Sequence, residues 1–323
     1  MTSNWIGHDA NWAQFSAGLQ SGKLHHGWIL AGPRGLGKAG FAARAAAALV
    51  DPEGRHSHLI GQRSHPDIIR LQRLAKDPPK DGEATDPDAE LKRSISIDQV
   101  REIQQALTTR PSMGPRRAVI IDSADDLERG GANALLKSLE EPPVGTFFLL
   151  ISHASDRLLP TIRSRCQLLR FDPLGKDQMR DVLAQTAPEL SVDERELLIR
   201  SGGGSPGQAL EFAGLDLAEI EGAIDTILSK GDGSNALRHK LAETLSLKAA
   251  QPRYEAFLRY VPARIAEHAR SMPSDSVLSA IDAFHAAETL AARAIGISLD
   301  KQAVVFQMGS LLASLQNTKQ QAN

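Results

Sequence analysis

Cysteine is almost absent from this chain of 323 residues, in which Cys166 is the single example. One thiol cannot form an intramolecular disulfide, and it cannot supply the several cysteines of a typical zinc site. Positive charge is not in excess either, because 37 Lys and Arg against 39 Asp and Glu give a net charge of −2. Tight binding of nucleic acid through overall phosphate neutralisation is therefore not expected, and any DNA contact should be local or made through partners.

Long apolar runs are missing as well. No segment approaches the roughly 20 apolar residues of a membrane span, so we expect no membrane insertion. The first residues, among them Asn4, His8 and Asp9, lack the apolar core of a secretory signal. With a single cysteine, these features favour a reducing cytoplasm. A hydrophobic share of 41% over this length is typical of a globular protein with two or three domains.

What the sequence does contain is a glycine-rich turn between an apolar run and an alanine-rich segment. The turn reads Gly32-Pro-Arg-Gly35-Leu-Gly37-Lys38-Ala39 and follows the apolar residues 28–31. Gly32, Gly37 and Lys38 fit the G-x-x-x-x-G-K pattern of a P-loop, in which backbone N–H groups and a helix N-terminus bind phosphate. The next position of that pattern needs Ser or Thr as a magnesium ligand, and Ala39 has no oxygen. Two interpretations stay open: the loop binds ATP or ADP through Lys38, or it is empty and kept for its shape.

A second chemistry-bearing segment is Asp122-Ser123-Ala124-Asp125, at the end of the apolar run 118–121. Asp122 occupies the position at which P-loop ATPases hold magnesium. Ser123 stands where such enzymes place a glutamate that orients the attacking water, and a serine is not a comparable base near neutral pH. Together with Ala39, Ser123 argues against hydrolysis at the chain's own site. For Asp122, metal binding and a purely structural role at a strand end both stay open.

The alternation of apolar runs and helical patterns predicts the fold class. Strand-like runs lie at 28–31, 68–71, 118–121 and 147–151. They predict an α/β domain with a doubly wound parallel sheet over residues 1–170. For the helix that carries Val100 we expect Asp98 as the N-cap. After residue 170 the sequence shows helical periodicity and no further strand-like runs. This pattern predicts a small helical domain over 171–214 and a C-terminal helical bundle over 215–323.

Two further motifs carry a resemblance. Ser164-Arg165-Cys166 follows the last strand-like run, and Asn133-Ala-Leu-Leu-Lys-Ser-Leu-Glu-Glu-Pro-Pro143 precedes it. Both resemble the clamp-loader branch of the AAA+ ATPases, which shares the S-R-C tripeptide and an N-A-L-L-K-x-L-E-E-P-P segment. Ser152 lies where that branch places its polar sensor-1 residue. Within the branch, the degraded P-loop and the Asp-Ser-Ala-Asp strand end resemble the delta-prime class of bacterial DNA polymerase III subunits.

The resemblance implies a fold, a function and partners. The fold would be an AAA+ domain, a helical lid and a C-terminal collar. Arg165 would be an arginine finger for the ATP site of a neighbouring subunit, while the chain itself needs no cofactor and hydrolyses nothing. Its partners would be clamp-loader subunits of the delta and tau or gamma types and, through the complex, the sliding clamp and primed DNA. The chain would then belong to a DNA-directed DNA polymerase (nucleotidyltransferase) holoenzyme without polymerising DNA itself.

The sequence departs from this branch at one place and leaves two rival functions open. Members commonly carry a four-cysteine zinc module after the P-loop helix, but residues 51–66 contain no cysteine, so no zinc is expected and their histidines should lie in a solvated loop. Cys166 should pack as a small apolar residue. One rival is a self-sufficient ATPase of the tau or gamma type, against which Ala39 and Ser123 argue. The other is a structural scaffold, in which Arg165 makes only a surface ion pair.

Overall fold

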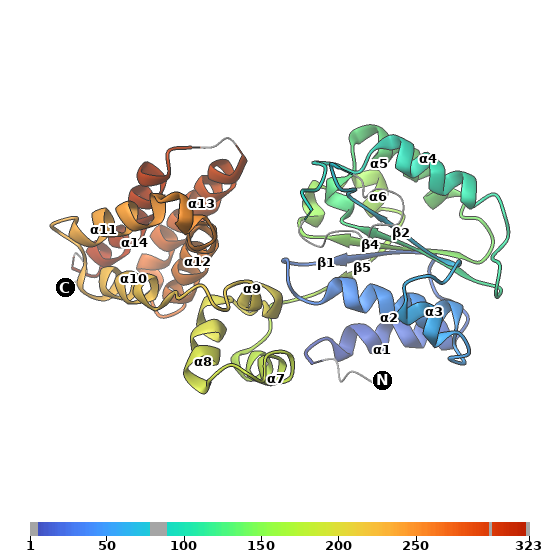
Figure 1. The fold of residues 1–323 in the computed structure, drawn as a ribbon, viewed down its shortest axis with the longest axis horizontal. Helices are drawn as coiled ribbons and strands as arrows, with labels where there is room; N and C mark the ends of the chain where they lie inside the picture. Colours follow the sequence, from blue (N-terminus) through green and yellow to red (C-terminus); the bar gives the residue numbers. More distant parts are fainter. Residues whose placement is uncertain (1–5, 78–88, 297–298, 321–323) are drawn as a thin grey trace. The chain divides into compact units, whose positions relative to one another are not determined.

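The computed structural model describes residues 6–77, 89–296 and 299–320 (Figure 1). The chain divides into two compact units, Met1–Leu174 and Gly175–Asn323. The three-domain division expected from the sequence stays a prediction. Within the described ranges, none of the helices combines the length and the apolar character that crossing a membrane demands.

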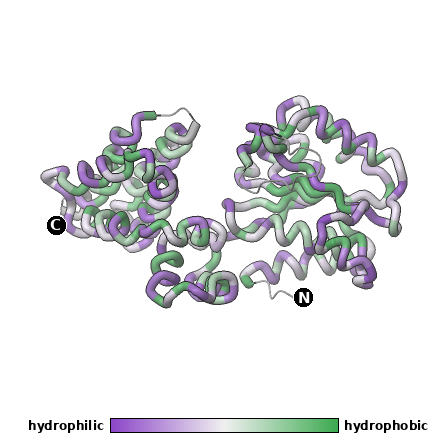
Figure 2. The backbone as a smooth tube through the Cα atoms, in the orientation of Figure 1, coloured by the Kyte–Doolittle hydropathy of each residue, from purple (hydrophilic) through white to green (hydrophobic). Residues whose placement is uncertain are grey.

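The first unit is built around a parallel sheet in the order β2-β3-β4-β1-β5. Its strands are β1 (Gly27–Ala31), β2 (Ile68–Gln72), β3 (Arg117–Asp122), β4 (Thr146–Ser152) and β5 (Gln167–Arg170). All five residues of β1 are buried, as expected for a strand inside a parallel sheet that is covered on both faces. Figure 2 shows hydrophobic residues concentrated along these strands. The expected α/β fold with a doubly wound parallel sheet is confirmed.

The edge strand β5 was not among the expected strands. It is four residues long, and only Leu169 of these is buried. A strand of this kind shows neither a continuous apolar run nor a clear alternation, so its side chains carry no signal. Backbone pairing with β1 defines it instead, and the backbone N–H of Phe171 continues the ladder by donating to Ala31 at 2.7 Å.

Helices cover both faces of the sheet (Figure 1). One layer contains α1 (Asp9–Gln20), α2 (Lys38–Val50) and α3 (Ser57–Gly61), and the other contains α4 (Ile97–Ala106), α5 (Arg129–Glu140) and α6 (Pro160–Arg163). Alternate residues of β1 enter the two cores. Trp28 packs with Phe15 and Phe41 on the side of α1 and α2, whereas Ile29 packs with Leu135 on the side of α5.

Two local expectations in this unit were wrong. The N-cap of α4 is Ser96 rather than Asp98, because the Ser96 hydroxyl accepts from the backbone N–H of Gln99 and the Gln99 side chain accepts from the backbone N–H of Ser96. This reciprocal capping box satisfies two donors that Asp98, inside the first turn, cannot reach. The histidine-containing segment is not simply a solvated loop either, since it includes α3 and its His65 is buried.

The described residues of the second unit form helices joined by turns, and no strand is found among them. Its helices are α7 (Lys176–Thr186), α8 (Val192–Ser201), α9 (Pro206–Glu211), α10 (Ala218–Lys230), α11 (Ala236–Ser246), α12 (Gln251–Ala269), α13 (Ser274–Gly296) and α14 (Lys301–Gln320). Short 3₁₀ turns occur at η3 (Lys248–Ala250) and, in the first unit, at η1 (Ala124–Asp126) and η2 (Ser155–Arg157). The Ser205 hydroxyl caps α9, and Pro206 occupies its first turn, where a proline costs no helical hydrogen bond.

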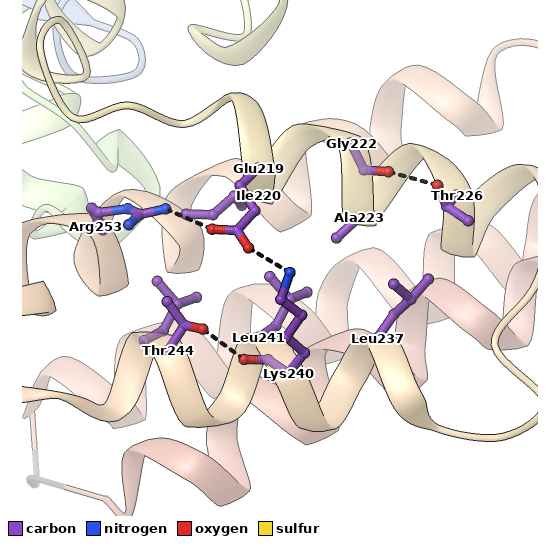
Figure 3. A pocket seen from close by; sticks show the side chains of 11 residues that line it. Glu219, Ile220, Gly222, Ala223, Thr226, Leu237, Lys240, Leu241, Thr244 and Arg253 are labelled. Carbon is purple, nitrogen blue, oxygen red and sulfur yellow. Dashed lines mark hydrogen bonds and ion pairs between the residues drawn. The ribbon is translucent and has the colours of Figure 1, made fainter.

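A pocket of about 240 Å³ lies between α10 and α11 (Figure 3). Its floor is apolar and includes Ile220 and Leu241. At its rim the Glu219 carboxylate lies 2.8 Å from Lys240 Nζ and 3.7 Å from an Arg253 Nη2. Both cations thus have Glu219 as a common ion-pair partner, and we interpret the pocket as a packing feature of the helical unit.

Candidate functional site

The glycine-rich loop joins β1 to α2, as the sequence predicts. Gly35 and Gly37 have φ angles of 76° and 77°, and Gly32 has a φ angle of 152°, a region that glycine adopts far more readily than other residues. A Cβ at Gly32 would lie 2.2 Å from the carbonyl oxygen of Phe171. These glycines therefore permit the sharp turns between β1 and α2, and Gly32 also allows the close approach of the segment that follows β5.

The Lys38 side chain is turned back onto this loop. Its Nζ donates to the carbonyl oxygens of Gly32 at 2.6 Å and of Pro33 at 2.5 Å, and the residue is only 3% exposed. Burial lowers the pKa of its amine to about 8, against the opposing effect of Asp125 and Asp122. A phosphate that bound here would have to replace these two carbonyl contacts, and the adjacent Ala39 offers no oxygen to a metal that accompanied it.

Asp125 connects the carboxyl ends of β3 and β4, a role that sequence reasoning missed. Its carboxylate accepts from the Ser152 hydroxyl at 2.8 Å and from the backbone N–H of His153 at 2.5 Å. It also accepts from the Ser123 hydroxyl at 3.3 Å. Ser152, which we predicted at the sensor-1 position, is fully buried and is thus held by a carboxylate of its own chain. An acid just after a buried strand was visible in the sequence, but its partners depend on the neighbouring strand.

Asp122 ends β3 close to Lys38. Burial raises the pKa of its carboxyl group, whereas the nearby Lys38 and Arg34 act in the opposite direction. Over the described residues, no group of three or more His, Cys, Asp or Glu side chains is arranged to hold a metal ion. The metal role of Asp122 therefore stays a prediction that would need ligands from a bound nucleotide or from water.

His153 is a second residue that sequence reasoning missed. Burial lowers the pKa of its imidazole to about 4, and the positive charges of Lys38 and Arg34 act in the same direction. Its Nδ1 is buried and has no hydrogen-bond partner among the described residues. The His153 imidazole is therefore neutral at pH 7, and it adds no positive charge that would attract phosphate to the loop.

We expect the α/β unit to lose stability as the pH falls from 6.5 to about 4. In this window the unfolded imidazole of residue 153 binds a proton and the folded one does not, so acid favours the unfolded state. Denaturant unfolding followed by tryptophan fluorescence measures this unit alone, because all three tryptophans precede residue 29. His153→Gln should lose less stability over the same window. His8, whose pKa burial also lowers, affects both proteins alike, and equal losses in the two would contradict the prediction.

Arg165 lies in the turn between α6 and β5. Its side chain is 34% exposed, and Nη2 lies 2.6 Å from Oε1 of Glu140 at the end of α5. Nη1 donates to the carbonyl oxygen of Thr161 at 2.9 Å and to the Ser164 hydroxyl at 3.3 Å. The surface ion pair that the sequence left open is thus present, and the role of Arg165 as an arginine finger stays a prediction.

Cys166 packs behind this turn as a small apolar residue would. A Cβ on Gly27, at the start of β1, would lie 2.9 Å from its Sγ. Burial raises the pKa of the thiol to about 12, so the thiolate is not formed at neutral pH. The thiol thus packs against the core beside β1, whereas the neighbouring arginine side chain stays partly exposed.

The P-loop and Arg165 lie at opposite ends of the parallel strands. β1 and β5 are parallel, with Trp28 opposite Gln167 and Ala31 opposite Arg170. The loop follows the carboxyl end of β1, whereas Arg165 precedes the amino end of β5. Since a strand rises about 3.3 Å per residue, the paired stretch alone places roughly 10 Å between them. The structure thus brings the loop, Asp122 and Ser152 to the carboxyl ends of the strands and leaves Arg165 at the amino end of β5.

A family model described as "DNA polymerase III, delta subunit" matches residues 7–175, more than half of the chain. The chain belongs to this family. With a P-loop after β1 and the sheet order β2-β3-β4-β1-β5, its first unit has the AAA+ type of fold. The resemblance to clamp-loader proteins that the motifs predicted is confirmed at the level of the family.

Curated relatives include two delta' subunits and a gamma/tau subunit of DNA polymerase III. The delta' subunit of Pseudomonas aeruginosa is 33% identical over 219 residues, which cover 65% of this chain and 61% of the relative. The delta' subunit of Escherichia coli K12 is 31% identical over 205 residues, or 60% of this chain and 56% of the relative. The gamma/tau subunit of Mycobacterium tuberculosis H37Rv is 32% identical over 225 residues, or 68% of this chain and 37% of the relative. The chain spans about three-fifths of the delta' relatives.

Solved structures that resemble the chain are more distant. A gamma subunit-related protein of DNA polymerase III from Thermotoga maritima is 17% identical, with a TM-score of 0.45 over 94% of this chain and 99% of the other. The RuvB Holliday junction branch migration motor of Thermotoga maritima is 16% identical, with a TM-score of 0.43 over 76% of this chain and 77% of the other. The order of the strands in the chain's own sheet defines the AAA+ type of fold.

Proposed function

We propose that this chain is a delta-prime-like subunit of the DNA polymerase III clamp loader that leaves ATP hydrolysis to a neighbouring subunit and supplies Arg165 to that site. Its partners are subunits of the delta and tau or gamma types. The assembled loader places the ring-shaped sliding clamp on primed DNA during replication. The curated relatives named delta' and gamma/tau support this assignment.

One observation carries the proposal: Arg165 precedes the amino end of β5, whereas the chain's own P-loop follows the carboxyl end of the parallel strand β1. A guanidinium in that place is too far away to contact a phosphate bound at its own loop, but it is exposed enough to meet one presented by another chain. The group suits this task, because it is always charged and binds oxygen atoms through a planar fork. An arginine finger supplied in trans accelerates phosphoryl transfer by about 10³–10⁵-fold.

The chain's own loop supports the other half of the proposal. Ala39 has no hydroxyl for magnesium, and Ser123 has no carboxylate for the attacking water. The Ser123 hydroxyl is bound to Asp125, and the Lys38 ammonium is bound to two loop carbonyls. We infer that the subunit requires neither a nucleotide nor zinc of its own, and that it acts as an activating component of a larger assembly.

Purified alone, the chain should show no ATP turnover above background, because two groups of the hydrolytic reaction are replaced. Mixed with delta-type and tau- or gamma-type subunits, it should form a heteromer of fixed stoichiometry that size-exclusion chromatography with light scattering detects. Brisk turnover by the lone chain would instead indicate a self-sufficient ATPase. Failure to form the heteromer with any such partner would remove the clamp-loader assignment.

A further inference from the structure

Glu140, the acidic partner of Arg165, occupies an unusual place for a carboxylate. It is the last residue of α5, where the helix dipole leaves partial negative charge on the free carbonyl groups. A carboxylate is disfavoured at such an end, and a basic residue is favoured. The Arg165 guanidinium, 2.6 Å away, supplies the compensating positive charge from a segment 25 positions later in the chain.

The guanidinium is held by acceptors of its own chain along its charged end. Both donors of Nη1 are engaged, one with the Thr161 carbonyl and one with the Ser164 hydroxyl, and Nη2 faces Glu140. Side chains of the pair keep 34% and 49% of their surface exposed. A phosphate group that approached this face would therefore meet a cation whose charge a neighbouring anion already balances.

We propose that Glu140 is a competing anion that holds Arg165 in the isolated subunit and gives it up to the nucleotide of a neighbouring subunit. This inference rests on the proposed role of Arg165. The carboxylate carries one negative charge, whereas a bound triphosphate carries several. The triphosphate therefore attracts the Arg165 guanidinium more strongly than Glu140 does when the neighbouring subunit has bound nucleotide. Glu140 does not touch the nucleotide. It is a positioning residue that acts through Arg165 and keeps the cation from unrelated phosphate groups before assembly.

The partial exposure of the pair fits such a transfer. Exposed ion pairs are weak, so the pair with Glu140 should shift the equilibrium between bound and free Arg165 by no more than about fivefold. A fully buried pair would hold the arginine too firmly to be exchanged. The adjacent Glu141 provides a matched control, because it is exposed and makes no ion pair among the described residues.

In the isolated chain, the rate at which phenylglyoxal modifies Arg165 tests the pair directly. Mass spectrometry of digests gives this rate, with the exposed Arg163 as internal reference. Glu140→Gln should raise the rate at Arg165 by about two- to fivefold, whereas Glu141→Gln should leave it unchanged. An unchanged rate in Glu140→Gln, or an equal rise in Glu141→Gln, overturns the inference without any assumption about what Arg165 does in a complex.

In the reconstituted complex, Glu140→Gln should raise kcat/KM for ATP by about two- to fivefold, a gain that damage to the fold does not produce. The double variant with Arg165→Ala should match Arg165→Ala alone, because Glu140 acts only through the guanidinium. A lower kcat/KM in Glu140→Gln would mean that Glu140 supports the arginine instead of competing for it, and it overturns the inference. If Arg165→Ala itself leaves turnover unchanged, the proposed function fails, while the modification rates still decide whether Glu140 holds Arg165.

Discussion

Replacing Arg165 with alanine in the assembled complex should slow ATP hydrolysis at the site that it serves by about 10³-fold or more. The guanidinium is expected to stabilise charge on the transferring phosphoryl group, and an alanine leaves that charge without a donor. A complex in which the other ATPase subunits carry inactivated P-loops isolates this one site. Turnover is then measured with the clamp and primed DNA, and light scattering confirms that the complex is intact.

Two further variants separate this role from a change of surface charge. Arg163→Ala removes a positive charge two residues away, from a side chain that lies 4.0 Å from Asp156, and should leave turnover unchanged. Arg165→Lys keeps the charge but loses the planar fork, so it should recover only part of the rate. Full activity of Arg165→Ala would leave the chain as a scaffold of the complex, the interpretation in which this arginine makes only a surface ion pair.

Asp67→Ala should lower the free energy of unfolding of the α/β unit by about 3–5 kcal/mol. Asp67 precedes β2 and is completely buried. Its carboxylate accepts from the backbone N–H groups of Ser112 and Met113, each at 2.7 Å, and lies 3.4 Å from Nη2 of the buried Arg117. The alanine variant would leave a buried guanidinium without its counter-charge and two amides without an acceptor.

The control for this effect is Asp98→Ala, which removes an exposed carboxylate from the same unit. Asp98 is 79% exposed and lies 3.3 Å from Arg101 in α4, so its loss should cost about 1 kcal/mol or less. Denaturant unfolding followed by tryptophan fluorescence compares the two variants in the α/β unit alone. Similar losses for Asp67→Ala and Asp98→Ala would show that burial of the first pair contributes little.

Much of the fold was predictable because buried parallel strands appear in the sequence as continuous apolar runs. β1, β3 and β4 lie inside the sheet and have this pattern, and the glycine-rich loop after β1 marks the strand-to-helix turn. β5 lies at an edge, is short and is mostly exposed, so only its backbone pairing defines it. The N-cap of α4 was misplaced because Ser96 and Asp98 both belong to the favoured residue types, and only the position of Gln99 decides between them.

The candidate site was predictable only in its local motifs. The P-loop, the end of β3 and the Ser-Arg-Cys turn are each contiguous, so their residue types and spacing identify them. The roles of Asp125, His153 and Glu140 depend on contacts between segments that are distant in the sequence, such as the 25 positions between Glu140 and Arg165. No spacing rule predicts which carboxylate a given arginine meets across such a distance.

The unreactive thiol of Cys166 has a practical consequence for studying assembly. With a pKa of about 12, it should not compete for maleimide reagents at neutral pH. Val144, in the turn between α5 and β4, is 95% exposed. A Val144→Cys variant would therefore carry one addressable position without removal of the native cysteine, and a fluorophore attached there could follow docking of the subunit in real time through energy transfer to a labelled partner.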